Sequence, residues 1–484
     1  MRKLASAVVV LLVIVLLAAP GIAGFAVEGV IEDRAVMYNE EYADFFELKI
    51  ESYDRSWFGS DAIASIKSSQ TYQDLMRANL ESDPNMDPVV IEELMSLLET
   101  QVFFDVSLQH GPVLFSDGMR LGLGSAVIEL DAGSGEMSEV KEALGVSYLL
   151  RQYSHISFGG VISFNGDMPA FSYQRDTTIT DFSGMEYSGV ADIYSGEVGF
   201  LMTAEELAVD ALAGRTTISG ISYSGEHVQL QPSVWVGDAQ ISVAAIVGKD
   251  AAENEVFNLQ NLSLDVRADA DASGQMANID GLYSIESVNA AGDLNIADTT
   301  MKISFGQIDI EALNTLVEIN NSGGWQNGMT DELRGAIYEM SAGSPVISFG
   351  PLDTLWQDEK LSTGMTISVD GSVLPDYESF NPMDTLMWSR LISSDAYIDM
   401  SDAMAVTLAT EYARSQIVAS LGDQAPTTDP AEIDAVAAQQ GPVLLYSFTQ
   451  QGVLKKTETG YTSKFIYKDG QAIVNDMPIP IFQQ

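Results

Sequence analysis

The residues with the clearest spacing for metal binding form one acidic turn in the middle of the chain. They are Asp269, Asp271, Ser273, Gly274 and Asp280. Counted from the first aspartate, they occupy positions 1, 3, 5, 6 and 12, the spacing of a loop that supplies oxygen ligands to calcium. However, the turn follows a strand-like alternation rather than a helix, and its last position carries aspartate in place of a bidentate glutamate. Calcium is therefore the only cofactor that the sequence suggests, and a plain aspartate-rich hairpin turn is the alternative.

Catalytic motifs are not evident elsewhere in the sequence. The histidines are His110, His155 and His227, each in a strand-like segment without a partner at the spacing of a helical metal site. The chain has no cysteine, no G-x-S-x-G nucleophile motif and no phosphate-binding glycine loop. A pair of catalytic carboxylates cannot be identified among 69 acidic residues. We therefore favour a non-enzymatic protein. The alternative is a hydrolase that acts on cell-wall or glycan substrates through a carboxylate pair.

The charge of the chain excludes one class of partner. The sequence carries 69 acidic against 23 basic residues, a formal net charge of −46, and the acidic residues are spread along its length. Such a surface repels nucleic acid and anionic lipid head groups. We expect no nucleic-acid partner, and we interpret the charge as a solvated acidic surface.

The elements that must position any site are mostly strands. Leu262, Leu264 and Val266 alternate with polar residues, and the same period of two recurs from Met301 to Phe305. This alternation gives a strand one wet and one dry face, which antiparallel sheets permit. Gly, Asn, Asp and Ser cluster between these segments at hairpin spacing. The sequence predicts an α+β fold, mainly antiparallel β, with a long one-sided sheet that can curl and a few helices.

Helices are predicted mainly outside the central strand region. Their expected ranges are 88–101, 311–320, 330–341, 401–421 and 429–440. A pattern of apolar-Ser-Gly followed by Tyr-Ser-Gly occurs at 182–189 and again at 218–225, which suggests repeated hairpins. We divide the chain into an N-terminal segment, an α+β region, a repeated-hairpin region and a C-terminal α+β region. Their ranges are 1–27, 28–150, 151–310 and 311–484.

The first 27 residues have the pattern of a membrane anchor. Arg2 and Lys3 precede a mainly apolar segment, Leu4 to Val27. As a helix this segment would rise about 36 Å, enough to cross a hydrocarbon core of about 30 Å. The positive residues place the N-terminus in the cytoplasm and the body outside it. We expect one retained transmembrane helix. A cleaved signal peptide is the alternative, because Gly21-Ile22-Ala23 has the small residues of a cleavage site.

Three segments carry a resemblance to a known family. The first is Tyr53-Asp54-Arg55-Ser56-Trp57-Phe58-Gly59-Ser60, and the second is His110-Gly111-Pro112. The third comprises Tyr461, Tyr467-Lys468-Asp469-Gly470 and Val474-Asn475-Asp476. In order and spacing these segments resemble the YdgA-like family of bacterial envelope proteins, with Ser56 and Asp476 where that family has glycine. Together with the basic start and the apolar segment, the resemblance spans about the whole chain.

The resemblance implies a single-pass protein of the bacterial inner membrane with a β-rich periplasmic body. It supplies no catalytic residues, and we interpret the motif positions as structural. Trp57 and Phe58 are expected to form an aromatic pair in a core, and His110-Gly111-Pro112 a rigid turn after a strand. The structural set also includes Tyr53, Arg55, Tyr467, Asp469, Gly470 and Asn475. Analogy with other anchored, β-rich envelope proteins suggests a lipid-like ligand or an envelope protein as partner.

Overall fold

The computed structural model describes most of the chain as two compact units. The described residues are Val36, Asn39, Ala43 and the ranges 45–82, 86, 88–115, 119–130, 136–231, 233–290, 294–321, 328–421 and 429–479. The predicted anchor lies outside them. Within the described ranges, no helix combines the length and apolarity needed to cross a bilayer. Unit 1 consists of Met1–Leu212 and Ser219–Val228, and unit 2 of Ala213–Ile218 and Gln229–Gln484. The boundaries predicted at residues 150 and 310 stay predictions.

Unit 1 contains antiparallel strands and a helical hairpin. Its strands are β1 (Phe46–Arg55), β2 (Gly59–Ser68), β3 (Val102–His110), β4 (Val113–Leu114), β5 (Arg120–Leu121), β6 (Gly124–Leu130), β7 (Leu150–Ile156), β8 (Val161–Met168), β9 (Phe171–Arg175), β10 (Thr178–Phe182), β11 (Met185–Asp192) and β12 (Glu197–Ala211). They pair in the order β1–β2–β3–β6–β7–β8–β11–β12, and β12 pairs further along with β10. Its helices are α2 (Gln70–Glu81), α3 (Pro88–Glu99) and α4 (Glu136–Leu144), and α3 contacts β2.

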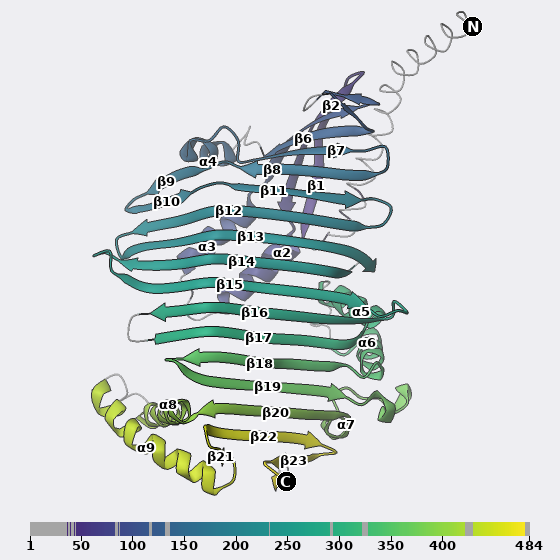
Figure 1. Cartoon of the computed structure of the whole chain (residues 1–484). Helices are drawn as coiled ribbons and strands as arrows, with labels where there is room; N and C mark the ends of the chain where they lie inside the picture. Colours follow the sequence, from purple (N-terminus) through teal and green to yellow (C-terminus); the bar gives the residue numbers. More distant parts are fainter. Residues whose placement is uncertain are drawn as a thin grey trace, which may run out of the picture. The chain divides into compact units, whose positions relative to one another are not determined.

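Unit 2 contains a second run of antiparallel strands that pair in chain order from β14 to β20 and end in β22, β23 and β24 (Figure 1). The strands are β14 (Val234–Asp250), β15 (Glu255–Ala270), β16 (Met276–Ala290), β17 (Leu294–Asp309), β18 (Val346–Trp356), β19 (Glu359–Val369), β20 (Ile392–Ser401), β21 (Lys455–Lys456), β22 (Gly460–Lys468), β23 (Gln471–Val474) and β24 (Met477–Ile479). The residues of β13 (Gly214–Gln231) are divided between the two units.

The helices of unit 2 lie at the two ends of its strands. At one end are α5 (Ile310–Asn321), α6 (Asp331–Ala342) and α7 (Thr385–Leu391), and at the other are α8 (Asp402–Leu421) and α9 (Pro430–Gln450) (Figure 1). Two short 3₁₀ turns, Gly371–Val373 and Tyr377–Ser379, precede α7. The prediction of a mostly antiparallel β fold with a large sheet and a few helices is confirmed.

The last helix is longer than the sequence predicts. We expected an end at Gln440, before Gly441-Pro442, but α9 continues through Pro442 to Gln450. The reason lies in its packing against α8. A Cβ atom at Gly441 would lie 2.3 Å from the Oγ1 atom of Thr410, so only glycine permits this approach of the two helices. Packing therefore outweighs the local preference of Gly-Pro to end a helix.

The two copies of the predicted repeat share a backbone conformation, but they do not form two similar hairpins. Gly184, in the first copy, has a φ of 97° and lies between β10 and β11. Gly220, at the same position of the second copy, has a φ of 62° and lies inside β13. Both glycines adopt the left-handed region that other residues avoid. The two copies of the repeat therefore share a left-handed glycine at the same position.

Candidate functional site

One face of the unit 2 sheet is apolar along rows that cross several strands. Residues directly opposite one another in an antiparallel pair share a face. The first row is Ile241, Leu264, Tyr283, Met301 and Leu352, and the second is Val266, Gly281, Ile303, Phe349 and Met365. A third row, nearer the other strand ends, is Ile246, Leu259, Val288, Ile296 and Trp356. We call the face that carries these three rows the apolar face.

The period of the side chains on the apolar face changes between the first and third rows, and β15 and β17 each contain a residue in the left-handed conformation at this change. Ile296 and Met301 are five residues apart, so a regular strand would place them on opposite faces. Asp298 lies between them with a φ of 47°, and Asn261 of β15 has a φ of 49° at the corresponding change of period. Such a residue reverses the alternation of the side chains that follow it. Asn261 also donates a hydrogen bond to Glu286 on β16, so these polar residues mark one line across the strands.

The backbone conformation at Asn261 leads to a stability prediction. Asn261→Val is expected to lower the free energy of unfolding by about 1–2 kcal/mol more than Asn261→Gly, because a β-branched residue is strongly disfavoured at positive φ. Both variants lose the hydrogen bond to Glu286, so their difference isolates the backbone. Urea unfolding followed by circular dichroism measures it. Equal midpoints for the two variants would show that Asn261 does not depend on the left-handed conformation.

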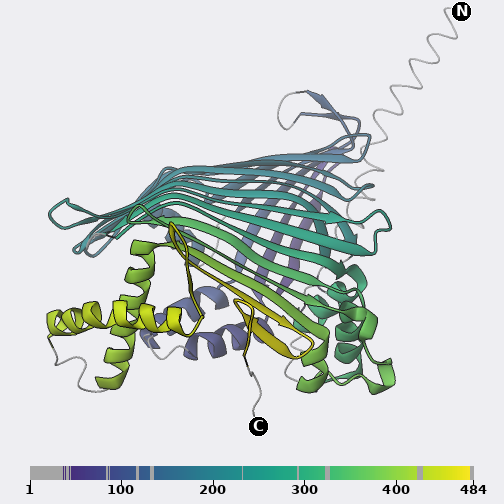
Figure 2. The same ribbon diagram turned by 60° about the horizontal axis from the view of Figure 1, so that its bottom comes forward.

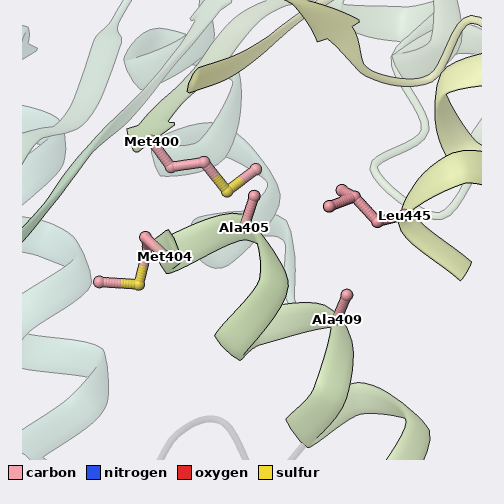
Figure 3. Packing of buried hydrophobic residues seen from close by; sticks show 5 residues of the cluster. All are labelled: Met400, Met404, Ala405, Ala409 and Leu445. Carbon is pink, nitrogen blue, oxygen red and sulfur yellow. The ribbon is translucent and has the colours of Figure 1, made fainter. Parts of the chain in front are cut away.

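The two ends of the apolar face are covered by helices. At one end, Ile310 of α5 packs with Ala277, Ile308 and Val234, and Phe305 and Met340 pack against this cluster. At the other end, Met400 of β20 packs with Met404, Ala405 and Ala409 of α8 and with Leu445 of α9 (Figure 3). Trp356 and Leu361 contact the second cluster. Figure 2 shows both groups of helices on the same side of the unit 2 strands.

Between these clusters, the apolar face is not buried. Ile241 is 45% exposed, Phe349 is 40% exposed, and Leu264, Tyr283 and Met301 are only partly buried. The opposite face of the same strands carries more polar side chains. There, Gln240 pairs with Asp265, Asp265 with Leu282, and Leu282 with Lys302. The sheet of unit 2 therefore has an apolar surface whose centre is accessible from solvent.

The predicted calcium turn connects β15 and β16, and each of its acidic side chains has its own partner. Asp271 accepts hydrogen bonds from the hydroxyl of Ser273 (2.8 Å) and the amide of Gln275 (3.0 Å). The Ser273 hydroxyl, followed by the Met276 amide, holds the pKa of Asp271 below its usual range. Asp269 forms an ion pair with Arg267 (2.6 Å). Within the described ranges, no three His, Cys, Asp or Glu side chains are grouped to hold a metal ion.

Asp280, the last predicted ligand, lies on β16 and contacts the neighbouring strand β17. It accepts a hydrogen bond from Ser304 (2.6 Å) and forms an ion pair with Lys302 (3.0 Å). The Ser304 hydroxyl and then the Lys302 ammonium lower the pKa of Asp280. Calcium binding by these residues stays a prediction.

Calorimetric titration with calcium tests this turn. Because Asp271 already satisfies the amides of its own turn, we expect no heat of binding at millimolar calcium. An Asp271→Asn variant is the control. Heat released by the native chain but not by this variant would place a calcium ion in the turn.

The structure places the first family motif partly at the surface. We expected Trp57 and Phe58 to form an aromatic pair in a core, but they are 58% and 56% exposed. The reason is their position in the turn between β1 and β2, where no second layer of the described chain covers them. Tyr53 lies within β1 and donates a hydrogen bond to Ser60 across the strand pair (2.8 Å). Arg55, at the end of β1, is exposed.

The second motif forms the expected end of a strand. His110 is the last residue of β3 and is only 2% exposed. Its backbone amide donates to Phe58 (3.2 Å), and neither ring nitrogen has a hydrogen-bond partner among the described residues. Gly111 follows with a φ of 124°, and Pro112 leads into β4. The backbone leaves the sheet at this glycine.

The C-terminal motif consists of two tight turns. Asp469 and Gly470 have φ of 52° and 74° and connect β22 to β23. Asn475 and Asp476 have φ of 49° and 73° and connect β23 to β24. Tyr467 donates a hydrogen bond to the carbonyl of Ser389 (3.0 Å). Asp476 thus occupies a left-handed position, which glycine adopts without strain.

Asn475 is buried and holds three chain segments together. Its side-chain oxygen accepts a hydrogen bond from the amide of Lys464 (2.9 Å). Its side-chain nitrogen donates to the carbonyls of Gly452 and Val453, each at 2.9 Å. The sequence predicted a structural role for this residue, but not these partners.

The change of period beside Asn261 and Asp298 was the signal that could have revealed the apolar face.

The comparisons with known proteins identify a family but no activity. No curated protein and no solved structure matches this chain. The model of one family, described as a bacterial protein of unknown function (DUF945), matches residues 1–482. The chain therefore belongs to the DUF945 family of bacterial proteins of unknown function.

Proposed function

We propose that this chain is a non-enzymatic envelope protein whose apolar face holds the acyl chains of a lipid. In this proposal Leu4 to Val27 anchor the chain in the bacterial inner membrane, and the body lies in the periplasm. The resemblance to YdgA-like proteins, which is compatible with the DUF945 family, supports this location. The observation that carries the proposal is the accessible centre of the apolar face between two helix-covered ends.

The chemistry of the apolar face favours acyl chains over other ligands. Rows of aliphatic and aromatic side chains offer dispersion contacts but few directed hydrogen bonds. Each methylene group that moves from water to this surface contributes roughly 0.8 kcal/mol, so a partly covered chain supplies enough affinity without a specific head-group site. The net charge of −46 repels anionic head groups. We therefore expect binding to depend on the chain of the lipid more than on its head group.

No observation favours the alternative of a hydrolase. Such an enzyme requires two carboxylates in a cleft, one of them kept protonated by burial. The buried polar side chains among the described residues are Ser, Gln, His and Asn, and no Asp or Glu is among them.

Lipid analysis of the purified full chain tests the proposal. We expect organic extraction and mass spectrometry to recover fatty acid or phospholipid. This lipid should stay bound when the chain is exchanged into a detergent that has no acyl chains of its own. A chain free of lipid, but still able to fold cooperatively, would contradict it.

A further inference from the structure

Several turns of unit 1 carry large apolar side chains that are exposed to solvent. The residues are Trp57 and Phe58 between β1 and β2, Phe115 and Met119 of the β4–β5 hairpin, Phe158 between β7 and β8, and Tyr194 between β11 and β12. All six are exposed, from 56% for Phe58 to 79% for Tyr194. We call these six residues the apolar rim. Exposed apolar side chains that gather in one patch mark an interaction site, whereas single ones do not.

The turns of the apolar rim lie at the same end of neighbouring strands. The amide of His110 donates to Phe58 (3.2 Å), and the amide of Leu123 donates to Ile156 (2.8 Å). The amide of Ile193 donates to Gly160 (3.3 Å), which connects the β7–β8 turn to the β11–β12 turn. With about 4.8 Å between paired strands, the rim extends roughly 30 Å along the edge formed by β1, β2, β3, β6, β7, β8, β11 and β12.

The composition of these turns differs from that of the chain. Their sequence, residues 56–58, 111–123, 157–160 and 193–196, contains Arg120 and a single acidic residue, Asp117, in a chain with 69 acidic residues. Asp117 lies outside the described residues. The turns of the rim thus combine aromatic side chains with few acidic residues of their own. Acidic residues flank them, since Asp192 accepts a hydrogen bond from the Tyr194 amide (2.8 Å) and Glu197 is exposed. Tryptophan and tyrosine prefer the interface between lipid head groups and hydrocarbon, and an arginine fits the phosphate of a phospholipid.

We propose that the apolar rim inserts into the head-group layer of the bilayer that holds the N-terminal segment. The inference rests on the anchored topology proposed above, and the length of the connecting chain permits it. Asn39 is fixed beside Leu48 of β1, with which it exchanges two hydrogen bonds of 2.7 Å. The strand from Leu48 to Arg55 spans about 24 Å. Residues 28–38 can extend to about 38 Å, so the end of the apolar segment reaches the rim.

Depth-dependent fluorescence quenching tests this docking in the full chain. The sequence has no cysteine, so a Met119→Cys variant carries one environment-sensitive fluorophore. Its matched control is Leu212→Cys, because Leu212 is similarly exposed (78% against 76% for Met119) but follows β12 at the strand end opposite Tyr194. Both variants are reconstituted into phosphatidylcholine vesicles that contain brominated lipid. We expect several-fold stronger lipid quenching at position 119 and stronger iodide quenching at position 212.

The possible outcomes test insertion of the apolar rim separately from membrane anchoring and from lipid binding by the apolar face. Equal quenching at the two positions, in chains that resist alkaline carbonate extraction, would overturn rim insertion while leaving the anchor in place. Protection of position 119 that rises with protein concentration in detergent alone would assign the rim to a second copy and also overturn it. A triple variant, Trp57→Ser, Phe115→Ser and Tyr194→Ser, should abolish the lipid quenching at position 119. Failure of the acyl-chain proposal would be seen separately. The purified chain would then carry no lipid, but brominated lipid would still quench the fluorophore at position 119.

Discussion

Replacing Leu264 with glutamate is expected to weaken the binding of a fluorescent fatty acid by about ten- to a hundredfold, since an unpaired polar group under a bound ligand costs about 1–3 kcal/mol. Leu264 lies at the centre of the apolar face, between Ile241 and Tyr283. An acyl chain on this face would desolvate the new carboxylate without supplying a partner. Titration of the variant and the native chain with the same fluorescent fatty acid measures the difference.

The matched control for this variant is Leu282→Glu. Leu282 lies on β16, which pairs with β15, the strand of Leu264. It pairs with Asp265 and therefore lies on the face opposite to Leu264. It is 43% exposed, and a charged side chain is tolerated there without loss of packing. We expect its affinity for the fatty acid to stay within twofold of the native value. Equal weakening by both substitutions would mean that charge, rather than the apolar face, controls binding.

Asn475→Ala is expected to destabilise the protein by about 3 kcal/mol, because it removes hydrogen bonds to three partly buried backbone groups and each such bond contributes about 1 kcal/mol. These groups are the amide of Lys464 and the carbonyls of Gly452 and Val453. Asn475 also has a φ of 49°, which alanine tolerates less well than asparagine. Denaturant unfolding of the full chain in detergent measures the loss.

Asp476→Ala is the control for this second prediction. Asp476 occupies the same turn, also has a positive φ, and makes only an exposed ion pair with Lys455. An exposed ion pair contributes about 0–1 kcal/mol, so this variant should lose little beyond the backbone cost that both share. If the two variants were equally destabilised, the hydrogen bonds of Asn475 would not be the source of the effect.

The alternation of apolar and polar residues was sufficient to predict the strands, but not which residues of one strand lie on the same face of the sheet. The alternation at Leu262, Leu264 and Val266 and from Met301 to Phe305 correctly predicted parts of β15 and β17. A strict period of two, however, separates Ile296 from Met301, whereas Asp298 brings them to one face. A change of period with Asn or Asp beside it indicates such a residue, because these types tolerate positive φ. Which strands contribute to one face also depends on the pairing between strands, and no local pattern specifies that pairing.

Other differences arise from contacts that are distant in sequence. Trp57 and Phe58 have the composition of a core pair, but their turn lies at the end of β1 and β2. Gly441-Pro442 has the composition of a helix end, but contact with Thr410 keeps the residues in α9. In each case a short pattern fits two structures, and tertiary contacts decide between them.

The lipid content of three purified full chains tests the central claim most directly: native, Leu264→Glu and Leu282→Glu. Any bilayer lipid that stays on the apolar segment from Leu4 to Val27 after detergent exchange would be the same in all three chains, so the difference between variants reports the apolar face alone. The account predicts that the native chain and Leu282→Glu retain the same excess of acyl-chain lipid, and that Leu264→Glu loses it. Equal lipid content in all three chains, each folded, would contradict the proposal that the apolar face of unit 2 binds acyl chains.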